Sequence, residues 1–168
     1  MAARRLVLIR HAKAAEGAVD LVRPLAPRGV RDAGAVGEWL ADNDLVPDRV
    51  VISPARRVRE TWARAAERLR HAPDAVVDDR IYENDVGALL DVIRDTPDTV
   101  RTLALLGHNP SFGDLAYQLD DGTGDAEARQ DVTAGFPTSA VAVYEVDDGW
   151  SGVTPRGARL VKYAAPRG

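Results

Sequence analysis

Short apolar segments alternate with amphipathic stretches along this chain, and this alternation constrains the fold more than any other feature. Continuous apolar runs of a few residues are typical of strands buried on both faces of a parallel sheet. Between them, apolar residues recur at the spacing of an amphipathic helix. We expect strands over residues 5–9, 49–52, 75–77, 102–106, 139–146 and 158–163, and helices over 30–42, 55–70, 85–95 and 111–119. The alternation predicts an α/β fold in three layers, with a mainly parallel central sheet covered by helices on both faces.

Three connecting segments carry their own expectations. Residues 13–28 form a long connection with two prolines, and long loops in compact domains are often functional. Residues 120–135 are rich in Asp, Gly and Thr, which predicts a polar surface loop. Ser53 followed by Pro54 is typical of an N-cap and a first helical residue, so a helix should start directly after the second strand.

Composition excludes several classes of function. The 168 residues suit one domain, which we expect over residues 1–168, and 45% hydrophobic with 29% charged residues is ordinary for a globular protein. A net charge of -4 argues against nucleic-acid or anionic-membrane partners. The absence of cysteine excludes a thiolate nucleophile and a thiolate metal site. No segment is apolar for long enough to form a signal peptide or a membrane span, so we expect a cytoplasmic protein.

Two of the three histidines follow directly after predicted strands. His11 stands in Arg10-His11 after the first strand, and His108 stands in Gly107-His108 after the fourth. Parallel strands present their carboxyl ends at one edge of a sheet, where open α/β folds bind ligands. The sequence therefore predicts that His11 and His108 share one crevice.

A cluster of arginines is expected at the same edge. Arg56, Arg57 and Arg59 lie in the first turns of the helix that begins after the second strand. A helix N-terminus attracts anions through its free amide groups and its dipole. Spacing alone does not choose among the three arginines.

Arginines and histidines without a thiol suit phosphoryl transfer. Guanidinium groups match the geometry of phosphate and stabilise the charge of the transition state. A neutral imidazole can attack phosphorus and form a phosphohistidine that water then hydrolyses. This chemistry uses side chains alone, so we expect no cofactor.

The same residues resemble motifs of a known family. Residues 10–12 read Arg-His-Ala, residues 53–61 contain Ser-Pro-x-x-Arg, and residues 107–110 read Gly-His-Asn-Pro. They are similar to the histidine phosphatase superfamily, the phosphoglycerate mutase-like group, and most of all to its small SixA-type phosphohistidine phosphatases. The likeness extends over about residues 4–163. It implies a phosphoglycerate mutase-like fold without a large capping insertion.

The resemblance also implies roles for four residues. His11 matches the phosphorylated nucleophile, and Arg10 matches the first phosphate-binding arginine. Arg57, the fifth residue of the Ser-Pro-x-x-Arg pattern, matches the second, and His108 matches the histidine that hydrogen-bonds a phosphoryl oxygen. Ala12 stands where the family usually has glycine, which leaves the shape of this loop open.

The proton donor has a weaker signal. Larger family members carry an acid after the third strand, and Glu83 lies at about the matching place. An exposed loop carboxylate would have the same pattern, and Asp85 resembles a helix N-cap. Lys13 and Arg23 are candidates for extra positive charge at the mouth of the pocket, and Tyr82 for its rim.

The predicted partner is a phosphorylated protein, with phosphohistidine as the first choice of substrate. A phosphatase of small phosphate esters or sugar phosphates is the main alternative, and a non-catalytic module that binds phosphoproteins is the alternative from another class. A metallophosphatase would need ligands such as His108, Asn109 and Asp114, but the sequence has no clustered ligand motif and we expect no metal. Nothing in the sequence indicates the oligomeric state.

Overall fold

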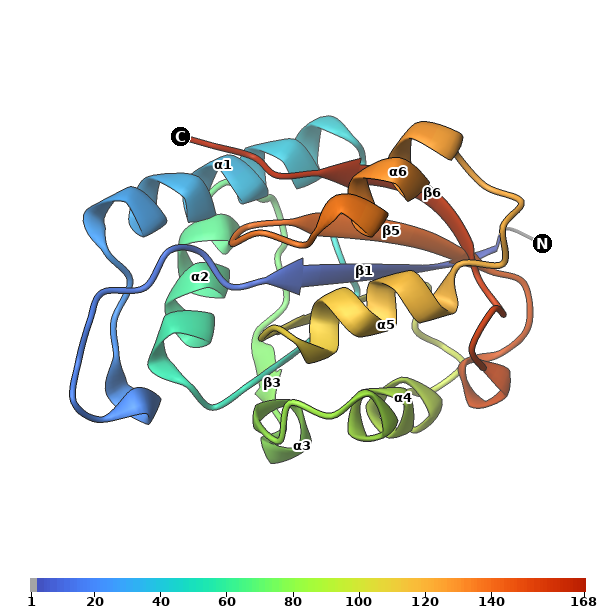
Figure 1. The fold of residues 1–168 in the computed structure, drawn as a ribbon, viewed down its shortest axis with the longest axis horizontal. Coiled ribbons are helices and arrows are strands. Elements are labelled where there is room, and N and C mark those ends of the chain that lie inside the picture. The colour runs from blue at the N-terminus through green and yellow to red at the C-terminus, as the bar shows by residue number, and fades with distance from the viewer. Residues whose placement is uncertain (1–2) are drawn as a thin grey trace.

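A six-stranded sheet lies between two layers of helices in the computed structural model, which describes residues 3–168 (Figure 1). The strands are β1 (Arg4–Arg10), β2 (Arg49–Ile52), β3 (Ala75–Val77), β4 (Thr102–Gly107), β5 (Val141–Val146) and β6 (Arg159–Ala164). The helices are α1 (Pro27–Asp42), α2 (Arg56–Ala66), α3 (Asp79–Tyr82), α4 (Val86–Arg94), α5 (Ser111–Leu119) and α6 (Ala126–Ala134), with 3-10 turns η1 (Asp20–Val22) and η2 (Trp150–Gly152). The predicted three-layer α/β fold is confirmed.

The strand order β3-β2-β4-β1-β5-β6 places β1 and β4 at the centre of the sheet. Strands β1 to β4 pair in parallel, whereas β5 pairs antiparallel with both β1 and β6. Arg10 is in register with Gly107, and Ile52 is in register with Leu106. The carboxyl ends of β1, β4 and β2 therefore lie side by side, as the histidine positions predict.

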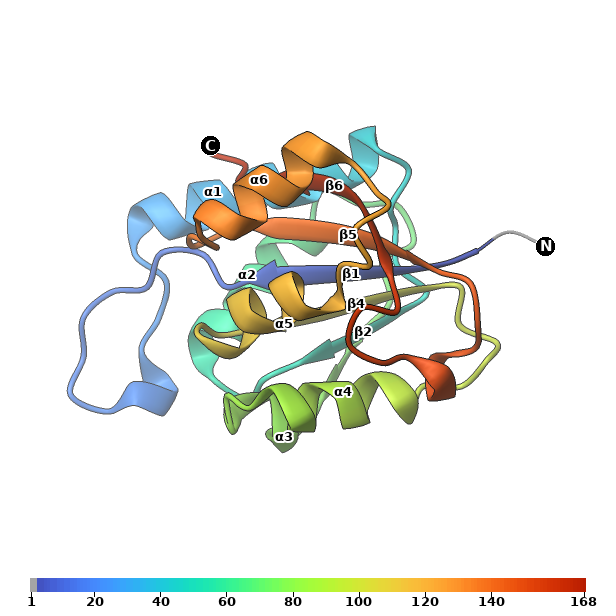
Figure 2. The ribbon, with the colours of Figure 1, turned by 45° about the vertical axis from the view of Figure 1, so that its right-hand side comes forward.

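Alternate residues of β1 pack into two separate cores. Leu6 and Leu8 are fully buried in a core with residues of α4 and α5, and Val7 and Ile9 are fully buried in a core with residues of α1 and α2. Figure 2 shows these two pairs of helices on opposite faces of the sheet. Burial of each such side chain stabilises the folded protein by roughly 1.5–3 kcal/mol. The strand buries side chains on both of its faces, which favours its central position in the sheet. Among residues 3–168, none of the helices combines the length and the apolar character of a membrane span.

The predicted loop over residues 120–135 is wrong in part, because it contains α6. Asp125 caps this helix, and its side chain accepts a hydrogen bond from the backbone N–H of Ala128. Ala128 and Val132 are one turn apart and are the buried residues of the helix. Two buried positions in a polar segment give too weak a periodicity to reveal a helix from sequence.

The predicted cap of α2 is also wrong. The helix begins at Arg56 with Ala55 as its N-cap residue. Ser53 instead lies one step beyond β2, fully buried, where its hydroxyl accepts a hydrogen bond from the N–H of Ala55. Ser53 thus ends the strand, and its side chain is available to the site described below.

The long connection after β1 has a fixed stem and a projecting tip. Ala26 donates a backbone hydrogen bond to Lys13 O at 2.9 Å, and Ala15 donates one to Pro24 O at 2.8 Å. Gly29 packs against the Lys13 carbonyl so closely that a Cβ atom there would collide with it. The tip carries η1 and projects beyond the end of β1, as the blue loop in Figure 1 shows.

Candidate active site

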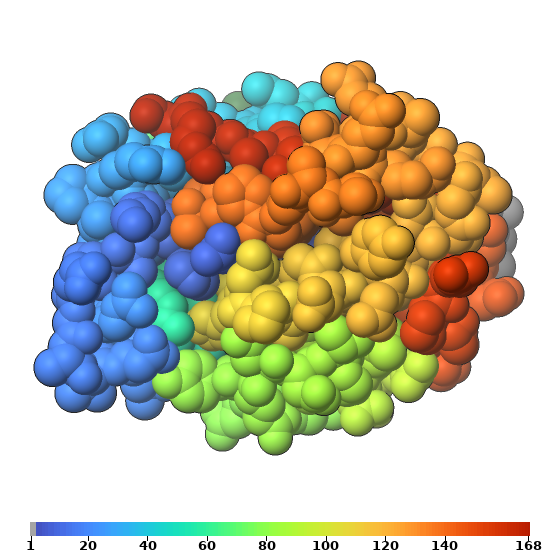
Figure 3. Space-filling view, in the orientation of Figure 1, coloured from blue at the N-terminus to red at the C-terminus, as the bar shows by residue number. Residues whose placement is uncertain are grey.

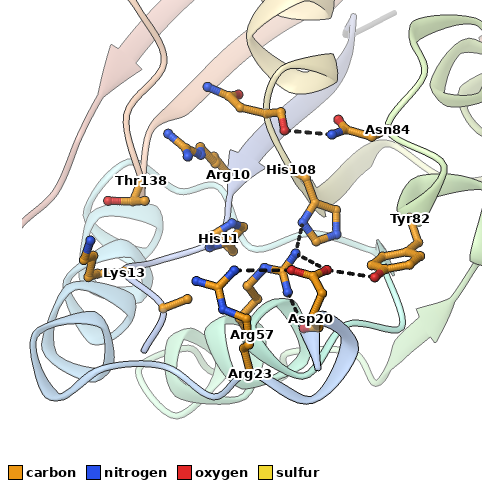
Figure 4. Close-up of a pocket in the computed structure, with 12 residues that line it drawn as sticks. Arg10, His11, Lys13, Asp20, Arg23, Arg57, Tyr82, Asn84, His108 and Thr138 are labelled. Carbon is orange, nitrogen blue, oxygen red and sulfur yellow. Dashed lines mark hydrogen bonds and ion pairs between the residues drawn. The ribbon is translucent and has the colours of Figure 1, made fainter. Parts of the chain in front are cut away.

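A cavity of about 550 Å³ opens at the carboxyl ends of β1 and β4. The four residues that the motifs single out, Arg10, His11, Arg57 and His108, all line it (Figure 4). Figure 3 shows its outer face as a hollow between the blue loop after β1 and the yellow and green segments around α5 and α3. The predicted crevice is therefore present, and both histidines lie in it.

His11 is oriented by its own loop. Its backbone N–H donates to Gly107 O at 3.0 Å, and its ring Nδ1 lies 2.7 Å from Ala12 O. Because a carbonyl only accepts hydrogen bonds, Nδ1 carries the proton and Nε2 keeps its lone pair. Burial, followed by the charges of nearby arginines, lowers the pKa of His11 to about 4, so the ring is neutral at pH 7.

Arg57 and Arg56 differ sharply in environment. The Arg57 side chain is 8% exposed and enters the cavity, whereas Arg56 is 50% exposed and pairs with Glu60 on the helix surface. The geometry therefore distinguishes two arginines that spacing could not separate. Arg10 is held by a bond from Nη1 to Phe136 O at 3.1 Å, while its buried Nε has no hydrogen-bond partner within residues 3–168. An unpaired buried donor at the edge of a cavity can bind an anionic ligand.

His108 makes a hydrogen bond with each ring nitrogen. Nδ1 lies 3.2 Å from Arg57 Nη2, and Nε2 lies 2.8 Å from the Ser53 hydroxyl. Since the guanidinium only donates, Nδ1 accepts and Nε2 carries the proton. Burial, His11 and Arg57 lower the pKa of His108 to about 3, which keeps this ring neutral as well. Ser53, predicted as a helix cap, thus orients His108.

The hydroxyl of Thr61 links the loop that follows His11 to α2. It accepts a hydrogen bond from the N–H of Ala12 at 3.0 Å and donates one to Arg57 O at 2.7 Å. The Ala12 methyl group is fully buried in a small cluster with Leu25 and Ala33. Alanine in place of the usual glycine is therefore accommodated by apolar packing, which answers the question that the motif left open.

Comparison with known proteins agrees with this geometry. The sequence profile described as "Histidine phosphatase superfamily (branch 1)" matches residues 6–102. The chain belongs to the histidine phosphatase superfamily. The family resemblance predicted from the motifs is confirmed.

Similar proteins match this histidine phosphatase over nearly its whole length. The uncharacterized protein Rv1276c of Mycobacterium tuberculosis is 40% identical over 162 residues, which cover 95% of this chain and 100% of the relative. Phosphohistidine phosphatase SixA of Escherichia coli is 26% identical over 151 residues, which cover 88% and 89%. A structure assigned to SixA of Nakamurella multipartitia superposes with a TM-score of 0.88 at 29% identity, over 99% of this chain and 98% of that one. The phosphatase is thus close to SixA proteins and carries no large insertion.

A carboxylate that sequence reasoning missed lies in the phosphatase pocket. Asp20, on η1, accepts a hydrogen bond from Arg57 Nη2 at 3.1 Å and one from the Tyr82 hydroxyl at 2.7 Å. Arg57 Nη1 also donates to the Asp20 backbone carbonyl at 2.8 Å. These bonds from Tyr82 and the arginines lower the pKa of Asp20 to about 2. The only sequence signal for Asp20 is its place in a long connection, and the sequence predicts Tyr82 only at the rim of the pocket.

The structure does not bring Glu83 into this group. Glu83 is exposed as the residue that ends α3, whereas its neighbours Tyr82 and Asn84 line the cavity. Its role as proton donor stays a prediction. Asp85 caps α4, with its side chain accepting from the N–H of Ala88, as expected.

Positive charge surrounds the opening. Lys13 and Arg23 line the cavity, as expected from their places near the motifs, and Arg23 Nη1 bonds to Asp20 Oδ1 at 3.3 Å. Within residues 3–168, no group of three or more His, Asp or Glu side chains is arranged to hold a metal ion. The chemical character of the pocket is that of an anion site with basic walls and two neutral imidazoles.

Proposed function

We propose that this phosphatase removes the phosphoryl group from phosphohistidine of a protein, through a covalent phosphohistidine at His11. The observation that carries the proposal is the orientation of His11. Its Nδ1–H is fixed on Ala12 O, so the lone pair of Nε2 is free in a cavity that also holds Arg10 and Arg57. A neutral, oriented imidazole beside two guanidinium groups is suited to attack phosphorus.

The proposed reaction has two steps. The lone pair of His11 Nε2 forms a bond to phosphorus while the bond to the leaving group breaks, and the leaving group keeps that electron pair. Arg10, Arg57 and His108 bind the phosphoryl oxygens. Water then attacks phosphorus, inorganic phosphate leaves, and His11 regains its neutral form with the proton still on Nδ1. Both steps use only the side chains named above and water.

Two observations favour a protein substrate. The relative from Escherichia coli is named a phosphohistidine phosphatase, and the chain matches it over 88% of its own length. Val19, Leu21 and Val22, next to Asp20 on the loop tip, are exposed apolar side chains, with Val19 61% exposed. Adjacent exposed apolar residues beside a site are typical of a contact surface for another protein. A cytoplasmic location belongs to the same proposal.

Trapping the covalent intermediate tests the proposal. The protein is mixed with a phosphohistidine-containing peptide, quenched without acid and digested for mass spectrometry. We expect phosphate on His11 and none on His71, the exposed histidine. Binding of the peptide without phosphorylation of His11 would support the phosphoprotein-binding module instead.

A substrate panel and a chelator test the finer claims. Phosphohistidine peptide, phosphoserine peptide and a sugar phosphate are compared by kcat/KM, with the first expected to be highest. A higher value for the sugar phosphate would favour the small-ester alternative. Activity should persist in excess EDTA, because the charges that bind phosphate come from arginines, and its loss would contradict metal independence.

A further inference from the structure

Asp20 puts a negative charge inside a pocket built to attract anions. Its carboxylate takes one bond from Arg57, one from Tyr82 and one from Arg23, and its backbone carbonyl takes a second bond from Arg57 (Figure 4). Both terminal nitrogens of Arg57 therefore bond to Asp20, and Nη2 also bonds to Nδ1 of His108. An incoming phosphoryl group that binds Arg57 therefore shares this guanidinium with the Asp20 carboxylate.

A carboxylate at this position opposes the binding of phosphate. The Asp20 carboxylate and a phosphoryl group are both negatively charged and repel each other at close range. The Asp20 side chain is 52% exposed, so solvent weakens this repulsion without removing it. The carboxylate is compatible with substrate binding when the substrate brings a positive group that pairs with it.

We propose that Asp20 determines specificity by accepting a hydrogen bond from the ring N–H of protonated phosphohistidine. This inference rests on the proposed function. In this proposal Asp20, which lies on η1 at the wall of the pocket, contacts the imidazole leaving group of the substrate. A phosphate ester has no N–H or positive charge at its leaving group and meets only the repulsion.

The chemistry of the leaving group makes this contact useful. When the far nitrogen of phosphohistidine is protonated, His11 Nε2 bonds to phosphorus, the P–N bond breaks, and the electron pair stays on the leaving nitrogen. The ring leaves as neutral imidazole with its proton still on the far nitrogen. No proton has to come from the enzyme, whereas an ester leaves as an alkoxide that needs one.

The ionisation of Asp20 agrees with an accepting role. Hydrogen bonds from Tyr82 and the arginines hold its pKa near 2, so the side chain is a carboxylate at neutral pH. A carboxylate accepts hydrogen bonds and cannot act as a general acid. Asp20 is therefore suited to hold a protonated ring and unsuited to protonate an ester oxygen.

The test compares Asp20→Asn with wild type on phosphoimidazole and p-nitrophenyl phosphate. The amide still accepts bonds from Arg57 and Tyr82 but carries no charge, and the site is exposed enough for the fold to survive. We expect the ratio of kcat/KM for phosphoimidazole to that for the ester to fall by roughly 10–100-fold, the value of one charge-assisted hydrogen bond. In the pH profile of kcat/KM for phosphoimidazole, the decrease on the alkaline side should also move to lower pH. Asp20→Ala should also lower the ratio of the two kcat/KM values.

Glu16→Gln is the matched control, because Glu16 is an exposed acid in the same loop that does not line the cavity. It should leave the ratio unchanged. If Asp20→Asn reduces or increases both activities in parallel, the ratio of the two kcat/KM values stays unchanged. That result would overturn the inference and mean that Asp20 only holds the loop in place. Wild type that hydrolyses only the ester would instead overturn the proposed function, so the two failures are distinguishable.

Discussion

Arg57 Nη2 lies 3.2 Å from Nδ1 of His108, and this contact determines which nitrogen of His108 carries the proton. Because Nδ1 accepts from Arg57, Nε2–H must donate to Ser53. For Nδ1 to donate to a phosphoryl oxygen, the proton must be on Nδ1 and Ser53 must donate to Nε2. A hydroxyl can do either, so Ser53 supports both tautomers of His108.

Ser53→Ala should therefore lower kcat about tenfold, the value of one hydrogen bond of ~1.4 kcal/mol, because the second tautomer of His108 loses its donor. It should also lower the free energy of unfolding by about 1–3 kcal/mol, since the buried Nε2–H loses its acceptor. Ser111→Ala is the control, because Ser111 Oγ donates to the His108 backbone carbonyl and not to the ring. Nitrogen-15 shifts of the His108 ring would report the tautomer, and equal loss of kcat in both variants would contradict the assignment.

His11→Ala should abolish turnover while the protein still folds. The ring lies at the end of β1 and outside the two apolar cores, so its loss costs stability through one hydrogen bond and leaves the sheet intact. Activity and circular dichroism of the purified variant are the measurements. Retained activity would remove His11 as the nucleophile, and His71→Ala should behave as wild type.

Arg57→Ala should reduce kcat/KM by roughly 10²–10³-fold, as loss of a preorganised charged donor does in other enzymes. Arg56→Ala should change kcat/KM less than about twofold, because Arg56 forms an exposed pair with Glu60 that is worth little. The two variants differ by one position on the same helix and are measured side by side. Equal losses would mean that the register of α2 is wrong.

Stability should fall as pH falls below about 6.5. Both His11 and His108 have a folded-state pKa lowered from 6.5, to about 4 and about 3. Between those values and 6.5 the unfolded chain binds more protons, so acid favours unfolding at roughly 1.4 kcal/mol per pH unit for each histidine. Urea unfolding at pH 7.5 and pH 5 measures this slope, and His11→Gln should make it shallower.

Glu83→Gln tests the remaining prediction for the proton donor. If Glu83 protonates an ester oxygen, the variant slows hydrolysis of a phosphate ester more than that of phosphohistidine, because the imidazole leaving group needs no proton from the enzyme. Rates on both substrates give the comparison. Equal rates to wild type on both would remove Glu83 from the mechanism and agree with its exposed position at the end of α3.

Sequence patterns predicted the sheet and the shared position of His11 and His108 because these depend on local signals, whereas Arg57 was singled out only by the family resemblance. The fully buried runs of β1 and β4 are continuous and apolar, and the residues that follow them reach the pocket by topology alone. The helix at 126–134 escaped prediction because Ala128 and Val132 are its only buried positions. Local propensity is a weak guide when so little of a helix faces the core.

The role of Asp20 could not be predicted because it depends on a long-range return of the chain. Asp20 meets Arg57, which is 37 residues away, and Tyr82, which is 62 residues away. No spacing rule relates these positions. The contact between Ser53 and His108 could not be predicted for a different reason. Ser-Pro is so typical of a helix start that a contact with a residue 55 positions later has no separate signal.

The hydrogen-bonded stem of the loop after β1 separates the position of His11 from changes in the tip of the loop. Backbone bonds between Lys13 and Ala26 and between Ala15 and Pro24 close the loop below its tip. We therefore expect changes within residues 16–23 to leave the position of His11 unaltered. If Asp20 selects the substrate as proposed, grafting residues 16–23 onto another histidine phosphatase of this size should transfer the substrate preference, because Asp20 and its bonds to Arg57 move with the segment.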